Sequence, residues 1–194
     1  SSIKVLSDMI FYSCNSLDNF IIPSSIISIE KNSFGGCRSL KQIVIPSSVT
    51  SIKEQAFGYC ESLERITIPS SITEFGEGIF CNCKKLNQII IQDKKNSIFN
   101  YHENNILLGK SHVNNHDYDV LLFANDSLET INVPPKIKRI CSYSLFDHEF
   151  LKEIYLPPSL LEIGENAFGI CKSLVKVNIP NSVNLIEKYA FFCC

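Results

Sequence analysis

The sequence has 194 residues, of which 45% are apolar and 20% charged. This balance supports a well-buried core and is unlike that of a disordered tail. The formal net charge of −2 excludes binding driven by charge, either to nucleic acid or to an anionic membrane surface. No run reaches the roughly 18 apolar residues that a membrane span needs, and no signal-peptide pattern is visible. The composition predicts a folded domain without membrane insertion.

The sequence repeats itself with a period of about 23 residues. One marker residue recurs at this spacing on both sides of an interruption: Cys14, Cys37, Cys60, Cys83, then His148, Cys171 and Cys194. Three residues after every marker except the last, a leucine opens an L-x-x-I-x-I segment, such as Leu40/Ile43/Ile45. A proline follows most segments and ends the predicted strand, because proline cannot donate a ladder hydrogen bond. A fixed period of this length predicts a solenoid.

The second half of each repeat carries an apolar pair and then a small residue followed by phenylalanine. Ala56-Phe57 and Ala167-Phe168 are examples, with Ile79-Phe80 and Ser144-Leu145 as variants. A phenylalanine at one position in every coil predicts an interior aromatic column, which we call the phenylalanine spine. An aromatic cofactor box is the alternative, but recurrence in every coil favours packing. We expect no cofactor.

Over Ile45–Leu63 (IPSSVTSIKEQAFGYCESL) the sequence resembles the BspA-type leucine-rich repeats, a family also found in a Treponema pallidum protein. The resemblance extends over nearly the whole chain. The stretch Tyr118–Ala124 is similar to an interruption in members from protist parasites such as Trichomonas and Entamoeba. The resemblance implies a curved solenoid that binds other macromolecules, often for adhesion in bacterial members, and it implies no catalytic residues.

We therefore expect an α/β solenoid, a leucine-rich-repeat right-handed superhelix of 23-residue coils. A parallel strand face would line one side, and a short extended or helical return the other. We expect one domain over residues 1–194, with regular coils at about 1–91 and 128–194 and one enlarged coil at about 92–127. No polar capping sequence is visible at either end. The sequence thus predicts either that the chain is truncated at both ends or that its open ends associate.

The enlarged coil interrupts the repeat. Leu86 and Leu128 are 42 residues apart where one coil would give 23, which indicates an insertion of about 19 residues. Two apolar runs, Ile106–Leu108 and Val120–Phe123, flank an Asn-rich turn at Ser111–Asp117. This pattern predicts a β-hairpin that projects from the solenoid or packs along it. The hairpin is either a specificity element or a coil variant that only bends the solenoid.

Few residues in the sequence suggest a metal site. In the hairpin, a metal site could be formed by His112, His116, Asp117 and Asp119. An Asn-rich turn gives no rigid frame for three or four ligands, so a solvated turn is favoured and no metal is expected. His102 is isolated, and His148 occupies a cysteine position.

The cysteines could form disulfides, and one sequon could carry a glycan. Six of the nine cysteines share the marker position, where parallel Cβ vectors suit buried free thiols better than disulfides. Cys81-x-Cys83 and Cys193-Cys194 lack the paired spacing of a zinc site. Asn125-Asp126-Ser127 is a glycosylation sequon, but Asn125 occupies the marker position that is usually buried. We expect neither disulfides nor glycosylation.

The proposed binding residues lie between the buried positions of the strands. Alternation places these side chains on the outer face of the sheet. We call them the strand-face residues: Gln42, Val44, Arg65, Thr67, Gln88, Ile90, Thr130, Asn132, Glu153, Tyr155, Lys176 and Asn178. Apolar side chains edged by polar groups suit a protein partner, whereas a carbohydrate would call for more aromatic platforms than Tyr155 alone. Part of this face is equally consistent with plain soluble sheet surface.

Enzyme motifs such as G-x-S-x-G, phosphate-binding glycine loops and H-E-x-x-H are absent from the sequence. We therefore expect a non-enzymatic protein that binds an unidentified protein partner. Two classes remain: an adhesin-like module at the cell surface or secreted, as the resemblance implies, and an intracellular leucine-rich-repeat scaffold or regulator of an enzyme such as a phosphatase. A reduced cysteine ladder would favour the cytoplasm.

Overall fold

The computed structural model describes residues 2–93, 97–102 and 105–194. Contacts between Cα atoms group the chain into an N-terminal unit, Ser1–Tyr101, and a C-terminal unit, His102–Cys194. In the described residues all regular structure is β, in short strands joined by turns. No helix in this part of the chain is long and apolar enough to cross a membrane. The expectation of one repeat domain over residues 1–194 stays a prediction.

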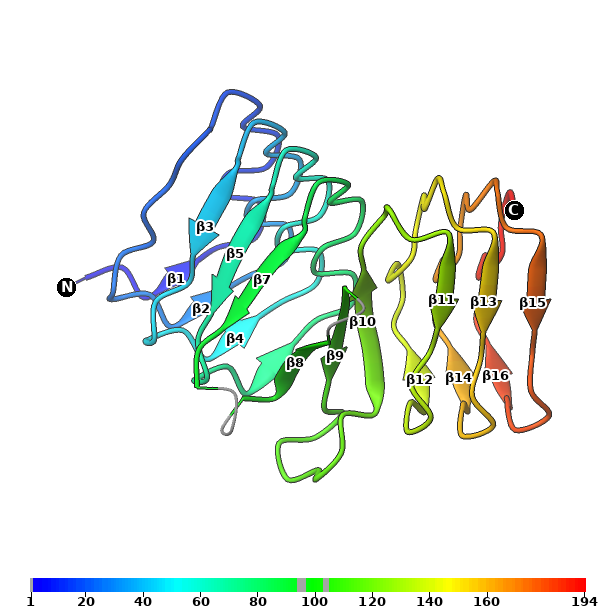
Figure 1. The fold of residues 1–194 in the computed structure, drawn as a ribbon. Helices are drawn as coiled ribbons and strands as arrows, with labels where there is room; N and C mark the ends of the chain where they lie inside the picture. Colours follow the sequence, from blue (N-terminus) through cyan, green and yellow to red (C-terminus); the bar gives the residue numbers. More distant parts are fainter. Residues whose placement is uncertain (1, 94–96, 103–104) are drawn as a thin grey trace. The chain divides into compact units, whose positions relative to one another are not determined.

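Two parallel sheets form the N-terminal unit (Figure 1). The strand face is the sheet of longer strands, β3 (Gln42–Val44), β5 (Arg65–Ile68) and β7 (Gln88–Ile91). The return sheet is made of two-residue strands, β1 (Val5–Leu6), β2 (Ser28–Ile29), β4 (Ser51–Ile52) and β6 (Glu74–Phe75). Each strand pairs with the equivalent strand of the next coil, as in Gln42 with Arg65 and Ser28 with Ser51. The last strand of this unit is β8 (Phe99–His102).

The C-terminal unit repeats this arrangement. Its strand face consists of β11 (Thr130–Asn132), β13 (Glu153–Tyr155) and β15 (Lys176–Asn178). Its return sheet contains β12 (Arg139–Ile140), β14 (Glu162–Ile163) and β16 (Leu185–Ile186). Thr130 pairs with Glu153, and Arg139 with Glu162, so paired residues again lie one repeat period apart. The predicted leucine-rich solenoid with 23-residue coils and a parallel strand face is confirmed within each unit.

The return half of each regular coil consists of a two-residue strand followed by a run of turns and contains no helix, which corrects the α/β class to an all-β solenoid in the described residues. The reason lies in the backbone, because two positions per coil have positive φ and so interrupt any helical turn. One set contains Met9, Asn32, Gln55, Gly78, Tyr143, Asn166 and Tyr189, and the other contains Ser13, Gly36, Tyr59, Asn82, Asp147, Ile170 and Cys193. The turns between the two sets are tight enough to close a coil within one repeat period.

The phenylalanine spine is confirmed in both units. In the N-terminal unit the rings of Phe11, Phe34, Phe57 and Phe80 stack with centroids 5.2, 5.3 and 6.0 Å apart. In the C-terminal unit Phe168 stacks on Phe191 at 5.0 Å. The adjacent small residues Ala56 and Ala167 are fully buried, so neighbouring coils approach closely there.

The cysteine ladder consists of free thiols, as expected. Five of the six marker thiols, those of Cys37, Cys60, Cys83, Cys171 and Cys194, donate a hydrogen bond to a carbonyl of the preceding coil. Examples are Cys60 Sγ to Phe34 O (3.2 Å) and Cys83 Sγ to Phe57 O (3.0 Å). Burial raises the pKa of both thiols, so they stay protonated donors at neutral pH. The expectation of burial is wrong for Cys14 and Cys194, which are exposed in the first and last coils.

Serine hydroxyls join neighbouring coils at most of the turns that follow a strand-ending proline. The serine two residues after the proline donates to a carbonyl 22 residues earlier: Ser48 Oγ to Ile26 O at 2.6 Å, Ser71 Oγ to Val49 O at 2.6 Å and Ser182 Oγ to Leu160 O at 2.7 Å. We call this column the serine ladder. It satisfies carbonyl groups that the short return strands leave unpaired.

The predicted hairpin is present and packs along the solenoid. Strands β9 (Ile106–Gly109) and β10 (Val120–Ala124) pair antiparallel, with a register shift between Leu121 and Phe123. On its other edge β10 pairs parallel with β12. Here Val120 pairs with Arg139, and the two residues are closer in sequence than one repeat period. Strand β10 thus serves as the return strand of the enlarged coil. The inner side chains, including Leu108 and Leu121, join the core of the C-terminal unit.

Candidate binding surfaces

The strand face of the N-terminal unit carries two exposed rows. Gln42, Arg65 and Gln88 are in register across β3, β5 and β7, and Val44, Thr67 and Ile90 form the next row. Arg65 Nε donates to Gln88 Oε1 at 2.7 Å. Val44 is 60% exposed and Ile90 47%, whereas Thr67 is half-buried between them. This face therefore combines apolar side chains with a hydrogen-bonded polar row.

The strand face of the C-terminal unit is more polar. Its rows are Thr130, Glu153 and Lys176, then Asn132, Tyr155 and Asn178. Tyr155 donates to Glu153, while Lys176 lies 3.9 Å from the Glu153 carboxylate and 5.3 Å from the centre of the Tyr155 ring. The structure thus brings the twelve strand-face residues together as two groups of six, one in each unit.

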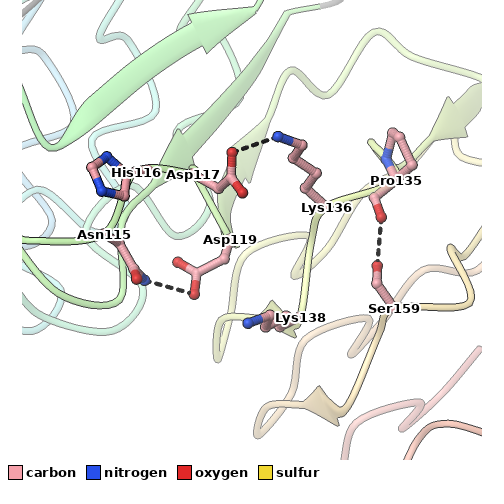
Figure 2. Close-up of a pocket in the computed structure, with 8 residues that line it drawn as sticks. All are labelled: Asn115, His116, Asp117, Asp119, Pro135, Lys136, Lys138 and Ser159. Atoms are coloured by element: carbon pink, nitrogen blue, oxygen red, sulfur yellow. Dashed lines mark hydrogen bonds and ion pairs between the residues drawn. The ribbon is translucent and has the colours of Figure 1, made fainter.

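A pocket of about 390 Å³ opens beside the hairpin loop in the C-terminal unit (Figure 2). Its existence follows from a break in the serine ladder. Lys136 occupies the ladder position one coil before Ser159. The chain that precedes β10 is the hairpin loop, which replaces the usual Pro-Ser-Ser turn. We call this space the loop pocket, lined by Asn115, His116, Asp117, Asp119, Pro135, Lys136, Lys138 and Ser159.

Asp119 anchors the hairpin loop. Only 6% of this residue is exposed. Its carboxylate accepts hydrogen bonds from Ser111 N at 2.8 Å, Ser111 Oγ at 2.8 Å and Asn115 Nδ2 at 3.0 Å. Its backbone carbonyl accepts a bond from Lys138 N at 2.8 Å. Asp119 therefore fixes both the loop and the strand that faces it, because a buried carboxylate needs such partners.

The other charged groups of the loop pocket lie at its rim. Lys136 Nζ donates to Asp117 Oδ1 at 2.6 Å, and this hydrogen bond lowers the pKa of Asp117. Ser159 Oγ donates to the Pro135 carbonyl at 2.7 Å. Figure 2 draws no bond from Lys138 to the other seven residues, and Lys138 is exposed. The lining therefore carries two carboxylates and two ammonium groups, and the charges of Lys136 and Lys138 both contribute to the lowered pKa of Asp117.

Three of the four residues considered as a metal site, His112, Asp117 and Asp119, have other partners. Asp119 and Asp117 are engaged as described above, and His112 Nδ1 accepts a bond from Asn114 N at 3.3 Å. In the part of the chain that the structure describes, no three His, Cys, Asp or Glu side chains converge as metal ligands. The side chain of His102 lies outside that part. The contacts of these residues favour a hydrogen-bonded turn over a metal site.

His148 and Asn125 both occupy buried marker positions. His148 Nδ1 lies 3.5 Å from Asp126 Oδ1, and burial lowers the pKa of the ring despite the raising effect of Asp126. The ring is therefore neutral at neutral pH. Asn125 is 5% exposed, and its side-chain oxygen accepts a bond from Ser127 N at 2.9 Å. The sequon asparagine is thus enclosed within the folded coil.

The sequence reasoning missed the pocket residues outside the hairpin, namely Pro135, Lys136, Lys138 and Ser159. One signal pointed to them, because the Pro-Lys pair at Pro135-Lys136 replaces the Ser-Ser pair found at Ser47-Ser48 and Ser70-Ser71. A lysine at a ladder position indicates that the ladder is broken there. Its ion pair with Asp117 of the hairpin loop became visible only in the fold.

The fold of this chain is similar to that of several solved structures. A leucine rich cell surface protein from Faecalibacterium prausnitzii is 26% identical with a TM-score of 0.73, and the match covers 94% of this chain and 53% of that one. The pneumococcal vaccine antigen PcpA is 24% identical with a TM-score of 0.66 (87% and 46% covered). The Treponema pallidum leucine rich repeat protein is 24% identical with a TM-score of 0.50 (95% and 67% covered). The chain spans about half the length of the first two.

A comparison with curated protein sequences gives no match. The origin of the chain in a protist parasite stays a prediction. A family model described as a BspA type leucine rich repeat region (6 copies) matches residues 4–120 and 119–194. Because these two matches together span almost the whole sequence, the chain belongs to the BspA-type leucine-rich repeat family.

Proposed function

We propose that this protein is a non-catalytic protein-binding module that uses its strand faces and its irregular coil for recognition. The observation that carries the proposal is the pair of exposed apolar side chains, Val44 and Ile90, on a regular sheet. Exposed apolar groups rimmed by polar side chains favour association with a protein surface, because binding removes them from water. The polar row of Gln42, Arg65 and Gln88 supplies hydrogen-bonding groups beside them.

An adhesin-like role at the cell surface is our first candidate. It is supported by the Faecalibacterium prausnitzii protein, which is described as a leucine rich cell surface protein. An intracellular scaffold or regulator of an enzyme such as a phosphatase is the second candidate. It is supported by nine free cysteines, since free thiols are typical of reducing compartments.

Variants of the strand face test the binding proposal. We would immobilise the protein, isolate a partner from extracts of the cells that produce it, and measure the affinity of that partner for variants. The double substitution Val44→Ser and Ile90→Ser is expected to weaken binding at least tenfold, as for hot-spot side chains. The matched control is Ile27→Ser, a residue 45% exposed outside the strand face. Equal affinity of the double variant and the control would contradict a role for this face.

Surface accessibility separates the two candidate locations. Intact cells that make the native protein would be treated with protease, and the full-length protein would then be followed by immunoblot beside a known cytoplasmic marker. Cleavage of the protein with the marker intact is expected for an adhesin-like module. Survival of both proteins would rule out that role and support the intracellular scaffold.

Self-association of the open ends is a further part of the proposal. In the last coil Leu185 and Ile186 are each 45% exposed, whereas Ile163, one coil earlier, is fully buried. Another copy that packs on this coil would remove these side chains from water. Light scattering over a range of concentrations is expected to show dimers, and Ile186→Ser is expected to reduce them. A monomeric mass at every concentration would refute this part.

A further inference from the structure

We propose that His148 and Asp126 form a proton-sensitive joint between the enlarged coil and the coil that follows it, and that this joint opens in mild acid. The joint lies within the C-terminal unit, because both residues belong to His102–Cys194. The inference goes beyond the proposed function, since it concerns the stability of one coil interface and needs no partner.

The joint occupies the marker position, which cysteine fills in most coils. One coil later, Cys171 donates its thiol hydrogen to Leu145 O at 3.0 Å. Burial raises the pKa of that thiol to about 12, so it neither gains nor loses a proton near neutral pH. Histidine has an ordinary pKa of 6.5. At His148 a ring that titrates near neutral pH therefore replaces a thiol that does not.

The His148 ring is enclosed among hydrogen-bond acceptors. Only 4% of its side chain is exposed, and Nδ1 lies 3.5 Å from Asp126 Oδ1. The backbone carbonyls of Ala124 and Asn125 also lie beside the ring. Among the described residues, neither ring nitrogen has a partner in full hydrogen-bonding geometry. A neutral ring offers a single N–H to these acceptors, whereas a protonated ring offers two.

Burial works against the protonated ring. Loss of hydration lowers the pKa of His148, and it outweighs the raising effects of the Asp126 carboxylate and of the two carbonyls. The other titratable groups on the adjoining segments are the neutral thiol of Cys171, the half-buried Asp147 and the exposed Glu149. Among the charged groups, Asp126 acts most strongly on the ring.

The sign of the pH effect follows from the lowered pKa. When the joint opens, His148 regains water and its ordinary pKa of 6.5. The closed joint keeps its full stability above that pH. At lower pH the open form takes up a proton that the closed form resists, so opening becomes more favourable. At about pH 5.5 the ceiling is roughly tenfold, because an ordinary imidazole is then about ten times more often protonated than neutral.

The joint also connects the hairpin to the following coil. On the hairpin side Asn125 N donates to Asn105 O at 3.0 Å. On the side of the following coil Asp126 Oδ1 accepts a hydrogen bond from Glu149 N at 3.0 Å. Both bonds end in the turn that faces the His148 ring. Opening of the joint therefore loosens one attachment of the hairpin to the rest of the unit.

Hydrogen exchange of the full chain, followed by NMR, tests this inference. The amides of Asn125 and Glu149 would be compared at about pH 7.5 and pH 5.5, each relative to the same amide in the unfolded chain. We expect the opening equilibrium to rise roughly five- to tenfold at the lower pH. His148→Cys supplies the thiol donor of the other coils and should reduce this rise to less than about twofold.

His112→Gln is the matched control, because it removes an exposed histidine of the same unit and should leave the rise unchanged. His148→Asn, with the residue that Asn125 provides at the marker position, gives a second test if the cysteine variant does not fold. The inference is overturned if the joint of the unmodified protein opens equally at both pH values, or if a folded His148 variant keeps the full rise. An equal rise at the amide of Ile66, in the N-terminal unit, would also overturn it, because the effect would then not belong to the joint.

Discussion

Replacement of Phe57 by alanine would test whether the phenylalanine spine holds the coils together. Phe57 is fully buried and stacks on Phe34 at 5.3 Å and on Phe80 at 6.0 Å. Removal of a buried phenylalanine costs about 3–5 kcal/mol through lost transfer energy and the cavity left behind. We expect Phe57→Ala at the upper end of this range, because two ring contacts disappear at about 0.5–1.5 kcal/mol each.

Two further variants distinguish the loss of ring stacking in the spine from a general loss of buried apolar volume. Leu145 occupies the same position in another coil and is also buried, so Phe57→Leu should fit the slot and cost about 1–2 kcal/mol. Phe191 is half-buried and stacks on Phe168 at 5.0 Å in the last coil. Phe191→Ala should therefore cost about 1–2 kcal/mol.

Urea unfolding followed by far-ultraviolet circular dichroism measures these changes as differences in the free energy of unfolding. Because each coil is stabilised by its neighbours, a cavity at Phe57 weakens the interfaces on both sides. The expected loss is a large part of the roughly 5–15 kcal/mol that stabilises a typical domain. A loss below about 1 kcal/mol for Phe57→Ala, or a loss equal to that of Phe191→Ala, would refute the stacking account.

Three more predictions concern the turns and the thiols. Ser48→Ala removes the donor to Ile26 O and should lower the free energy of unfolding by about 1 kcal/mol in urea titrations. Ser47→Ala, at the exposed neighbour, should change it by less than about 0.5 kcal/mol, and equal effects would contradict the serine ladder. Ile170 has a φ of 64°, which costs about 1–2 kcal/mol. Ile170→Gly should therefore raise the melting temperature by a few degrees, and a decrease would show that side-chain packing outweighs the strain. Burial raises the pKa of Cys171 from 9.0 to about 12, so the folded state keeps a proton that the unfolded state loses. Its contribution is complete below pH 9 and is lost as the pH rises from 9 toward 12. Unfolding at several pH values under reducing conditions should show this decline, and Cys171→Ala should make it less steep, because the other buried thiols remain. The same slope in both proteins would refute the contribution of Cys171.

Some features of the structure could be predicted because they depend on residues that recur in every coil. The buried column of Leu40, Leu63 and Leu86 and the spine at Phe34 and Phe57 follow directly from the 23-residue period. The hairpin was predictable for a different reason, since two apolar runs flank an Asn-rich turn. A solenoid needs the same kind of side chain at the same slot in every layer, so the period alone specifies strand positions and register.

Other features depend on partners that a repeat does not specify. The extended return could not be told from a helical one, because residues such as Gln55 and Tyr59 adopt positive φ without being glycine. The hydrogen bonds of the thiol and serine ladders could not be predicted from the sequence, because their acceptors are backbone carbonyls of the preceding coil.

The amino-acid sequence alone determined the 23-residue coil, the phenylalanine spine, the free thiol column and the position of the enlarged coil. The tertiary structure decided the chemistry of the loop pocket. Asp119 is buried against Ser111, Lys136 pairs with Asp117 of the hairpin loop, and the backbone N of Lys138 donates to the Asp119 carbonyl. These contacts lie where the repeat is broken. A periodic pattern predicts the neighbours of a residue only where the repeat is regular. In the enlarged coil, the partners of charged side chains depend on the path of the folded loop.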